Sequence, residues 1–276
     1  MFVIIGKTLM DYLLATYLFL LGACFGSFAG AVAWRLYVGR NFTKERSECE
    51  HCHHVLSPLD LIPVASWLWL RGRCRYCKKP IGSSALLSEL TLGSVFVLSY
   101  LYWPFALTDG LGWAMFVVWL AATVCLTTLF LYDMKHYLLP DKIVFPLIAL
   151  GVVLFVYRLS FQGMSVAQAP LELLLALLPV AGLYALLYAV SSGKWVGFGD
   201  VKLGIFIGLA LGWQGALAAL IIANLLGTLW VVPQLATKRL SRTDVVPFGP
   251  FLIVATVMAF LWADELLAGY LALFLV

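Results

Sequence analysis

Long apolar stretches recur along this chain of 276 residues, and they constrain its fold more than any other feature. A helix that crosses a bilayer needs about 20 mainly apolar residues. The chain is 63% hydrophobic and 12% charged, against roughly 45–50% and 25% in soluble domains. The sequence therefore predicts an all-α polytopic membrane protein with about eight transmembrane helices, near residues 12–34, 85–106, 112–132, 143–159, 170–190, 202–213, 215–234 and 249–275.

The lengths of the sixth and the first of these stretches bear on the number of spans. The sixth, 202–213, is too short to cross a bilayer alone at about 1.5 Å per residue, and its boundary with the seventh falls in Gly212-Trp213-Gln214-Gly215. Seven spans therefore remain open as an alternative. The first apolar stretch is too long for a cleavable signal peptide and has no basic region before it, so we expect it to be a true span.

The basic residues predict the orientation. If the spans alternate, all of the 18 Lys and Arg residues except Lys7 and Arg158 lie on one side of the membrane. Basic loops stay in the cytoplasm, so the N-terminus is expected on the periplasmic side and the 35–84 segment inside. The net charge of +4 then reflects topology, and no nucleic-acid partner is expected.

Four of the six cysteines form two C-x-x-C pairs between the first two spans. Four thiolates make a closed tetrahedral zinc site, and cytoplasmic thiols rarely form stable disulfides. The sequence predicts a small zinc-ribbon-like cytoplasmic insertion at 36–84 with short strands or turns. Its expected ligands are Cys49, Cys52, Cys74 and Cys77, with His51, His53 and His54 as alternative donors.

Other interpretations of these cysteines exist. Reduced or redox-active thiols are the simpler one. Cys49 to His53 also fits the C-x-x-C-H pattern of c-type haem attachment, but that haem is attached outside the cytoplasm and the second pair has no following histidine. Cys24 and Cys125 lie within spans, where a lone cysteine behaves as a small hydrophobe.

Two acidic residues stand at the ends of apolar stretches. Asp133 follows one directly, and Asp200 opens another after Gly197 and Gly199. Acids at the edge of hydrocarbon are costly and are therefore functional candidates. A carboxyl in the last turn of a helix is favoured in its protonated form, and one in the first turn in its charged form. Two such groups that share one proton are typical of aspartic-protease chemistry. The simpler interpretation is a pair of ordinary interfacial acids.

The neighbours of these acids have expected roles too. Asp141 is expected to cap the fourth span, and Lys202 to bind a lipid headgroup or a nearby carboxylate. Glycines at every fourth position allow close packing of the sixth span. A rigid turn is expected before the last span and could shape the site. These last two features are Gly204, Gly208 and Gly212, and Pro247-Phe248-Gly249-Pro250.

Over nearly its whole length the chain resembles the type IV prepilin peptidases, which are membrane aspartyl proteases with a GxGD motif. The resemblance rests on the order of its motifs: Phe25-Gly26-Ser27-Phe28, the paired cysteines, Glu89-Leu90, Asp133 with Leu138-Leu139-Pro140-Asp141, Gly197-Phe198-Gly199-Asp200 with Lys202, and Pro247-Phe248-Gly249-Pro250. GxGD alone would be weak, but in this order it is highly specific.

The resemblance implies a function and its parts. Asp133 and Asp200 match the family's catalytic aspartates, with Gly197, Gly199, Lys202 and Asp141 as active-site support. The implied substrates are type IV prepilins or type II secretion pseudopilins, cut at the cytoplasmic face of the bacterial inner membrane. Members with the tetra-cysteine segment usually also N-methylate the new N-terminus with S-adenosylmethionine. No glycine-rich nucleotide-binding turn is visible in 35–84, so the residues that hold the methyl donor stay unassigned.

The expected organisation is a first span at 1–35, a cytoplasmic module at 36–84 and a peptidase bundle at 85–276. Two other classes of function remain open. One is a proton-coupled transporter with the acids as a relay, although no internal duplication is visible. The other is a zinc-ribbon scaffold with inert acids. Membrane lipids are expected partners, and the sequence leaves the oligomeric state open.

Overall fold

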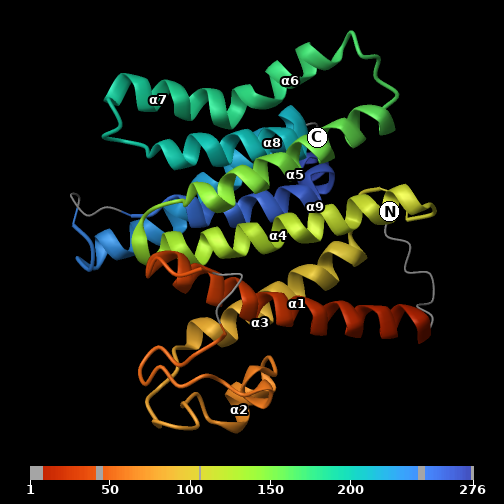
Figure 1. The fold of residues 1–276 in the computed structure, drawn as a ribbon. Coiled ribbons are helices and arrows are strands. Elements are labelled where there is room, and N and C mark those ends of the chain that lie inside the picture. The colour runs from red at the N-terminus through yellow and green to blue at the C-terminus, as the bar shows by residue number, and fades with distance from the viewer. Residues whose placement is uncertain (1–8, 42–45, 106, 242–245, 275–276) are drawn as a thin grey trace. The chain divides into compact units, whose positions relative to one another are not determined.

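A computed structural model describes residues 9–41, 46–105, 107–241 and 246–274. These residues form helices and turns and contain no β-strand (Figure 1). Six helical segments among them are long and apolar enough to cross a membrane, and the first part of the last helix, Gly249–Trp262, is shorter and also apolar. The predicted all-α membrane fold is therefore confirmed. The helices are α1 Leu9–Tyr37, η1 Pro58–Leu61, α2 Ala65–Trp69, α3 Ser83–Leu101, α4 Gly110–His136, α5 Asp141–Phe161, α6 Ala169–Leu177, η2 Leu178–Gly182, α7 Leu183–Ser191, α8 Phe198–Ala236 and α9 Gly249–Phe274.

The chain divides into two compact units, Met1–Trp103 and Pro104–Val276. In the first unit, α1 packs against α3 through glycines. A side chain at Gly26 would meet the Ser88 carbonyl oxygen at 2.5 Å, and one at Gly93 the Phe19 carbonyl oxygen at 2.9 Å. Such small residues allow the close backbone approach that holds membrane helices together. The predicted functional segments, namely the first span at 1–35, the module at 36–84 and the peptidase bundle at 85–276, stay a prediction.

The cysteine module lies between α1 and α3 and has little regular structure. Each cysteine pair sits in a tight turn closed by one isolated β-bridge, Glu48 with Val55 and Arg73 with Pro80. This matches the expected short strands or turns. The module also holds the short helices η1 and α2, the latter visible beside the start of α3 in Figure 1.

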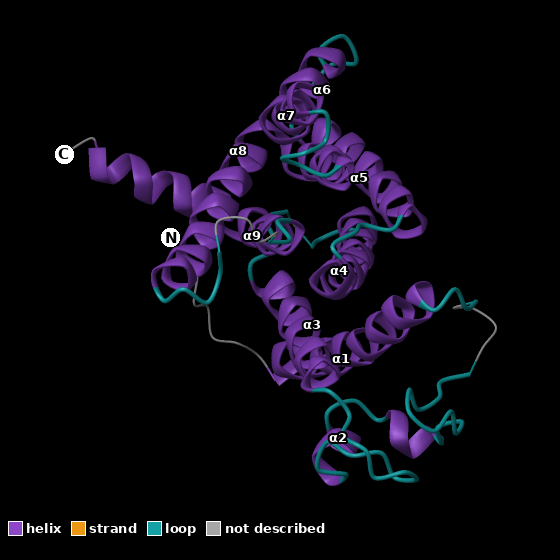
Figure 2. Cartoon of the chain, turned by 90° about the vertical axis from the view of Figure 1, so that its left-hand side faces the viewer, coloured by secondary structure: helices purple, strands orange, loops and turns teal. Residues whose placement is uncertain are grey.

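The second unit contains α4 to α9. Figure 2 views α4 to α7 and the start of α9 nearly along their axes, so the axes of these helices are roughly aligned, whatever the chain direction. The segment from Ala169 to Ser191 is one continuous span with a π-helical turn, η2, at its centre. Pro179 lies in this turn, where its missing N–H and its ring exclude regular α-helical bonding. The rings of Trp119 and Phe260 stack at 3.5 Å and join α4 to α9 in the core.

The long helix α8 is two antiparallel segments that meet at Gly212. This residue has φ 72° and ψ −179°, a conformation essentially restricted to glycine. Near its start α8 is tied to Asp141 at the start of α5, and at Gly212 it lies against Arg158 near the end of α5. Gly227 then faces the ring of Phe248, immediately before α9. The break therefore falls at the predicted boundary between the spans 202–213 and 215–234.

The predicted glycine face of the sixth span is confirmed at two positions. A side chain at Gly204 would meet the Ala181 backbone nitrogen at 2.8 Å, and one at Gly208 the Ala176 carbonyl oxygen at 2.3 Å. The first segment of α8 therefore packs against the α6–η2–α7 span at backbone distance. The third glycine, Gly212, makes the break described above. Because this packing fixes the first segment of α8, it also fixes where Asp200 lies.

Candidate active site

Asp133 and Asp200 lie at the same end of the second unit. Asp133 stands in the last turn of α4 and is 5% exposed, whereas Asp200 stands in the first turn of α8 and is partly exposed. The two carboxyl groups are close enough to interact electrostatically. Both placements within the helices match the sequence prediction, and residues 67 positions apart are brought to one site.

Local backbone geometry fixes the helix end at each aspartate. α4 ends at Tyr137, whose left-handed backbone (φ 57°) lets its N–H donate to the Asp133 carbonyl oxygen at 2.9 Å. At the start of α8, the Asp200 N–H donates to the Gly197 carbonyl oxygen at 3.1 Å, and the Gly197 N–H in turn donates to the Asp200 carboxylate. The first turn of α8 is thus closed around Asp200 by the first glycine of the GxGD motif.

The glycine at the start of α9 lies directly against Asp133. An ideal Cβ placed on Gly249 would be 2.5 Å from the Asp133 Oδ2 and 3.7 Å from the Leu139 Cδ2. One placed on Gly199 would be 3.1 Å from the Leu139 Cβ. The side chain of Leu139 therefore lies between the start of α8 at Gly199 and the start of α9 at Gly249. The turn before the last span was expected to shape the site, and its Gly249 lies directly against Asp133.

Lys202 and Asp141 form an ion pair across this end of the bundle. The Lys202 ammonium also lies 5.6 Å from the ring centre of Phe145 and 5.3 Å from that of Phe198, both within cation–π range. Of the two partners expected for Lys202, the structure therefore shows the carboxylate. The expectation that Asp141 caps the fourth span is wrong. Pro140 occupies the N-cap position, and Asp141 is the first helical residue.

One aromatic residue near Asp200, Tyr184, was not singled out from sequence. Tyr184 of α7 is buried and interacts electrostatically with Asp200. Its ring meets that of Phe248 edge to face at 6.1 Å. A tyrosine in an apolar span resembles any core aromatic, and this chain has 12 tyrosines. In the sequence, only Pro179 marks this part of the apolar stretch as irregular.

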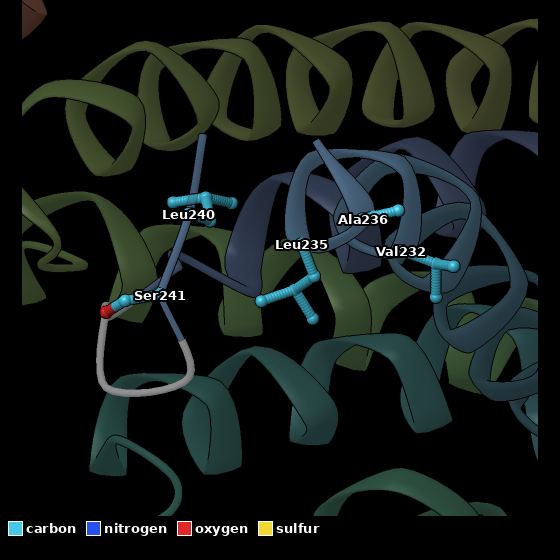
Figure 3. A pocket seen from close by; sticks show the side chains of 5 residues that line it. All are labelled: Val232, Leu235, Ala236, Leu240 and Ser241. Carbon is cyan, nitrogen blue, oxygen red and sulfur yellow. The ribbon is translucent and has the colours of Figure 1, made fainter. Parts of the chain in front are cut away.

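The described part of the chain also has a shallow apolar pocket of about 470 Å³ at the end of α8 (Figure 3). Val232, Leu235, Ala236, Leu240 and Ser241 line it. None of the residues around Asp133 or Asp200 lines this pocket. The candidate active site is therefore the group of side chains between α4, α8 and α9, and the pocket is a separate feature.

The four cysteines of the module form a second candidate site. Four Sγ atoms lie within 4.8 Å of one another, those of Cys49, Cys52, Cys74 and Cys77. Such a group could hold a metal ion. The Sγ atoms of Cys49 and Cys77 are 3.9 Å apart. Tetrahedral zinc with Zn–S bonds of about 2.3 Å places its sulfurs about 3.8 Å apart. The donor set and the spacing therefore fit zinc.

The thiols of this cluster differ in acidity. Burial raises the pKa of Cys49 to about 11. Burial acts on Cys74 in the same direction, but hydrogen bonds from the backbone of Cys77 and Tyr76 outweigh it and bring the pKa of Cys74 to about 7. Backbone amides directed at a sulfur favour the thiolate, which is the form that binds a metal. Two of the histidines expected as alternative metal donors have other partners: His53 pairs with Glu48, and the ring of His54 lies on that of Tyr76.

Comparison with known proteins covers both units. Residues 20–103 match the family "Bacterial Peptidase A24 N-terminal domain", and residues 120–232 match the "Type IV leader peptidase family". The first match includes all four cysteines of the cluster. The second includes Asp133, Asp141, Gly197, Gly199, Asp200 and Lys202.

Three curated relatives, each called prepilin leader peptidase/N-methyltransferase, illustrate the similarity. The protein of Aeromonas hydrophila is 32% identical over 85% of this chain and 78% of its own length. That of Stutzerimonas stutzeri is 30% identical over 84% and 76%, and that of Legionella pneumophila 31% over 84% and 77%. No solved structure gives a significant match. The chain belongs to the type IV leader peptidase family.

Proposed function

We propose that this chain is a membrane-embedded aspartyl endopeptidase. It removes the short basic leader of type IV prepilins or pseudopilins at the cytoplasmic face of the bacterial inner membrane. The observation that carries the proposal is the pair Asp133 and Asp200, brought to one end of the bundle in a chain of the type IV leader peptidase family. The basic loops support the orientation, with the N-terminus in the periplasm.

In the proposed mechanism the two aspartates share one proton and activate a water molecule. Asp200, among the free amides at the start of α8, holds the negative charge and takes a proton from water. The resulting oxygen nucleophile attacks the scissile carbonyl carbon, while the protonated Asp133 donates a hydrogen bond to the carbonyl oxygen. When the C–N bond breaks, the proton that Asp200 took moves to the leaving nitrogen, and both aspartates return to their starting state.

The surrounding residues position this pair. The Gly197 N–H holds the Asp200 carboxylate, and Gly199 gives Leu139 the space that it needs between the two turns. The ion pair of Lys202 with Asp141 joins α8 to α5 two residues after Asp200. These four residues are thus active-site support. Fixed geometry of this kind is what converts a weak acid–base pair into an effective catalyst.

A second activity, N-methylation of the new N-terminus with S-adenosylmethionine, is part of the proposal. It is supported by the names of the relatives and by the tetra-cysteine module. We propose zinc as the metal of that module. Its role is structural, because four thiolates leave no open coordination position and a module of about 50 residues needs such a staple.

The test is to incubate the purified protein in lipid with a purified prepilin, with and without S-adenosylmethionine. Mass spectrometry of the mature pilin then reports both activities. The proposal expects loss of the leader in both samples and a further 14 Da, one methyl group in place of hydrogen, only with the methyl donor. An intact prepilin from a folded enzyme would refute the peptidase, and cleavage without the added mass would refute the methyltransferase alone.

A further inference from the structure

The cysteine module carries an exposed apolar patch that neither cleavage nor metal binding explains. It consists of five side chains on the two short helices η1 and α2 and on the turn between them, namely Leu59, Leu61, Ile62, Leu68 and Trp69. Trp69 is 87% exposed and Leu59 is 63% exposed. Exposed apolar surface of this kind, gathered on adjacent elements, marks an interaction site more often than chance.

The two tryptophans of α2 face different environments. The ring of Trp67 folds back over Gly72, where an added Cβ would meet its Cζ2 at 2.8 Å, and its Nε1 is buried. Trp69, two residues later, points out of the module with its neighbour Leu68, which is 59% exposed. The helix is therefore apolar on its outer face as well as on its inner face.

One hydrogen bond sets the level of this patch along α3. The buried carboxylate of Glu89 accepts a 2.6 Å hydrogen bond from the N–H of Val64, which is the N-cap residue of α2. Val64 has φ 61°, which is strained for a β-branched residue, so this contact fixes a specific backbone shape. Glu89 is six residues into α3, or about 9 Å along it at about 1.5 Å per residue.

This level corresponds to the membrane interface. α3 has 19 residues, so it is about 28 Å long at about 1.5 Å per residue and needs nearly its whole length to cross a hydrocarbon core of about 30 Å. α3 therefore begins at the boundary between headgroups and acyl chains, and Glu89 lies about 9 Å inside that boundary at about 1.5 Å per residue. Interfacial helices bury their apolar face about 5–10 Å deep at this boundary, and tryptophan is enriched there.

The charges around the patch fit an anionic lipid surface. From Ser57 to Gly82 the chain has five basic residues and one acid, Asp60. Asp60 pairs with Arg75. The other four, Arg71, Arg73, Lys78 and Lys79, are exposed. Basic residues next to an interfacial apolar face attract the anionic cytoplasmic leaflet.

We propose that η1 and α2 lie at the boundary between the headgroups and the acyl chains, with Trp69 inserted among the acyl chains and the basic residues on anionic headgroups. The module is then a membrane-bound element held at the level where α3 enters the bilayer, and Glu89 sets that level. The proposal rests on the chain spanning a membrane and is independent of the proposed catalysis.

The test uses the full-length protein in nanodiscs of mixed phosphatidylglycerol and phosphatidylcholine whose acyl chains carry bromine near the headgroup. Bromine quenches only those tryptophans that reach it. The fluorescence of Trp69 is the difference between the wild type and Trp69→Phe, a mild change at an exposed position. Trp67→Phe is the matched control, because it reports the inward-facing tryptophan of the same helix.

The proposal expects brominated lipid to lower the Trp69 signal at least twofold, with little quenching of the same signal by acrylamide in the aqueous phase. The Trp67 signal should change little with either quencher. Strong acrylamide quenching without lipid quenching would place Trp69 in water and overturn the proposal. Protection from both quenchers would mean that protein covers the patch, which would also overturn it. Equal quenching in pure phosphatidylcholine would refute the part assigned to the basic residues.

Discussion

The contact between Gly249 and Asp133 predicts a large loss of activity from one added methyl group. In Gly249→Ala the new Cβ would stand 2.5 Å from the Asp133 Oδ2. Ordinary contact between such atoms is about 3.5 Å, so the carboxylate must retreat by about 1 Å. The Asp133 carboxylate is the end of a rotatable side chain, and Gly249 does not have a positive φ. The substitution should therefore leave the fold intact but displace the Asp133 carboxylate.

The expected cost is catalytic. A misplacement of about 1 Å in an active site lowers the rate about 100-fold, which corresponds to about 2.7 kcal/mol of transition-state stabilisation. The assay is the initial rate of prepilin cleavage by purified enzyme in lipid, with thermal unfolding measured on the same samples. Gly249→Ala should cleave about 100-fold more slowly while unfolding near the wild-type temperature.

Gly227→Ala is the matched control. Gly227 is also a buried glycine that faces the start of α9, but its added Cβ would lie 3.5 Å from the Phe248 ring, an ordinary contact. This variant should cleave at close to the wild-type rate. If Gly249→Ala were folded and as active as Gly227→Ala, the start of α9 would not set the position of Asp133, and the reasoning would fail.

Three further predictions concern stability and metal. Gly212→Ala should lower the unfolding free energy by more than about 2 kcal/mol, because it forces a side chain into a glycine-only backbone conformation and places a Cβ 1.5 Å from the Arg158 Nη1. Gly110→Ala is the control, because its added Cβ meets nothing within 4 Å. Thermal melts should show it to be as stable as the wild type. Cys74→Ser should remove the bound zinc measured by atomic emission and open the module to protease, whereas Cys24→Ser in α1 should keep the metal. Burial raises the pKa of Asp60, but hydrogen bonds from Ser57, Arg75 and Tyr76 outweigh it and leave that pKa below its ordinary value. Asp60 therefore stabilises the module above the unfolded-state pKa of about 3.9, and this is lost as the pH falls through the lower folded value. Asp60→Asn should lower the unfolding free energy of the module by about 1–3 kcal/mol at neutral pH, measured by limited proteolysis. A difference from the wild type that did not shrink as the pH fell below the ordinary Asp pKa of about 3.9 would count against this network.

Features with local physical causes could be predicted from the sequence. The spans follow from runs of apolar residues, and the break in α8 from a short stretch that ends at a glycine. The placement of Asp133 at a helix end and of Asp200 at a helix start follows from the same pattern. The clustering of the four cysteines follows from the two C-x-x-C turns.

Contacts between distant segments could not be predicted in this way. The approach of Gly249 to Asp133 depends on how α9 packs on α4, and nothing near either residue encodes it. Tyr184 comes near enough to Asp200 to interact electrostatically because α7 and the start of α8 lie side by side (Figure 1). The expected cap at Asp141 failed because Pro140, with its extended backbone, took the N-cap position and left Asp141 free to pair with Lys202.

The central claim is that Asp133 and Asp200 together activate one water molecule. Its most direct measurement is the single-turnover cleavage of a purified prepilin by Asp133→Asn and by Asp200→Asn, each shown to be folded and inserted. The account predicts that each substitution alone abolishes cleavage. An amide at position 200 cannot take the proton from water, and an amide at position 133 cannot share the one proton that the two carboxyl groups hold between them. Cleavage at the wild-type rate by either variant would contradict it and would favour a scaffold or another catalytic group.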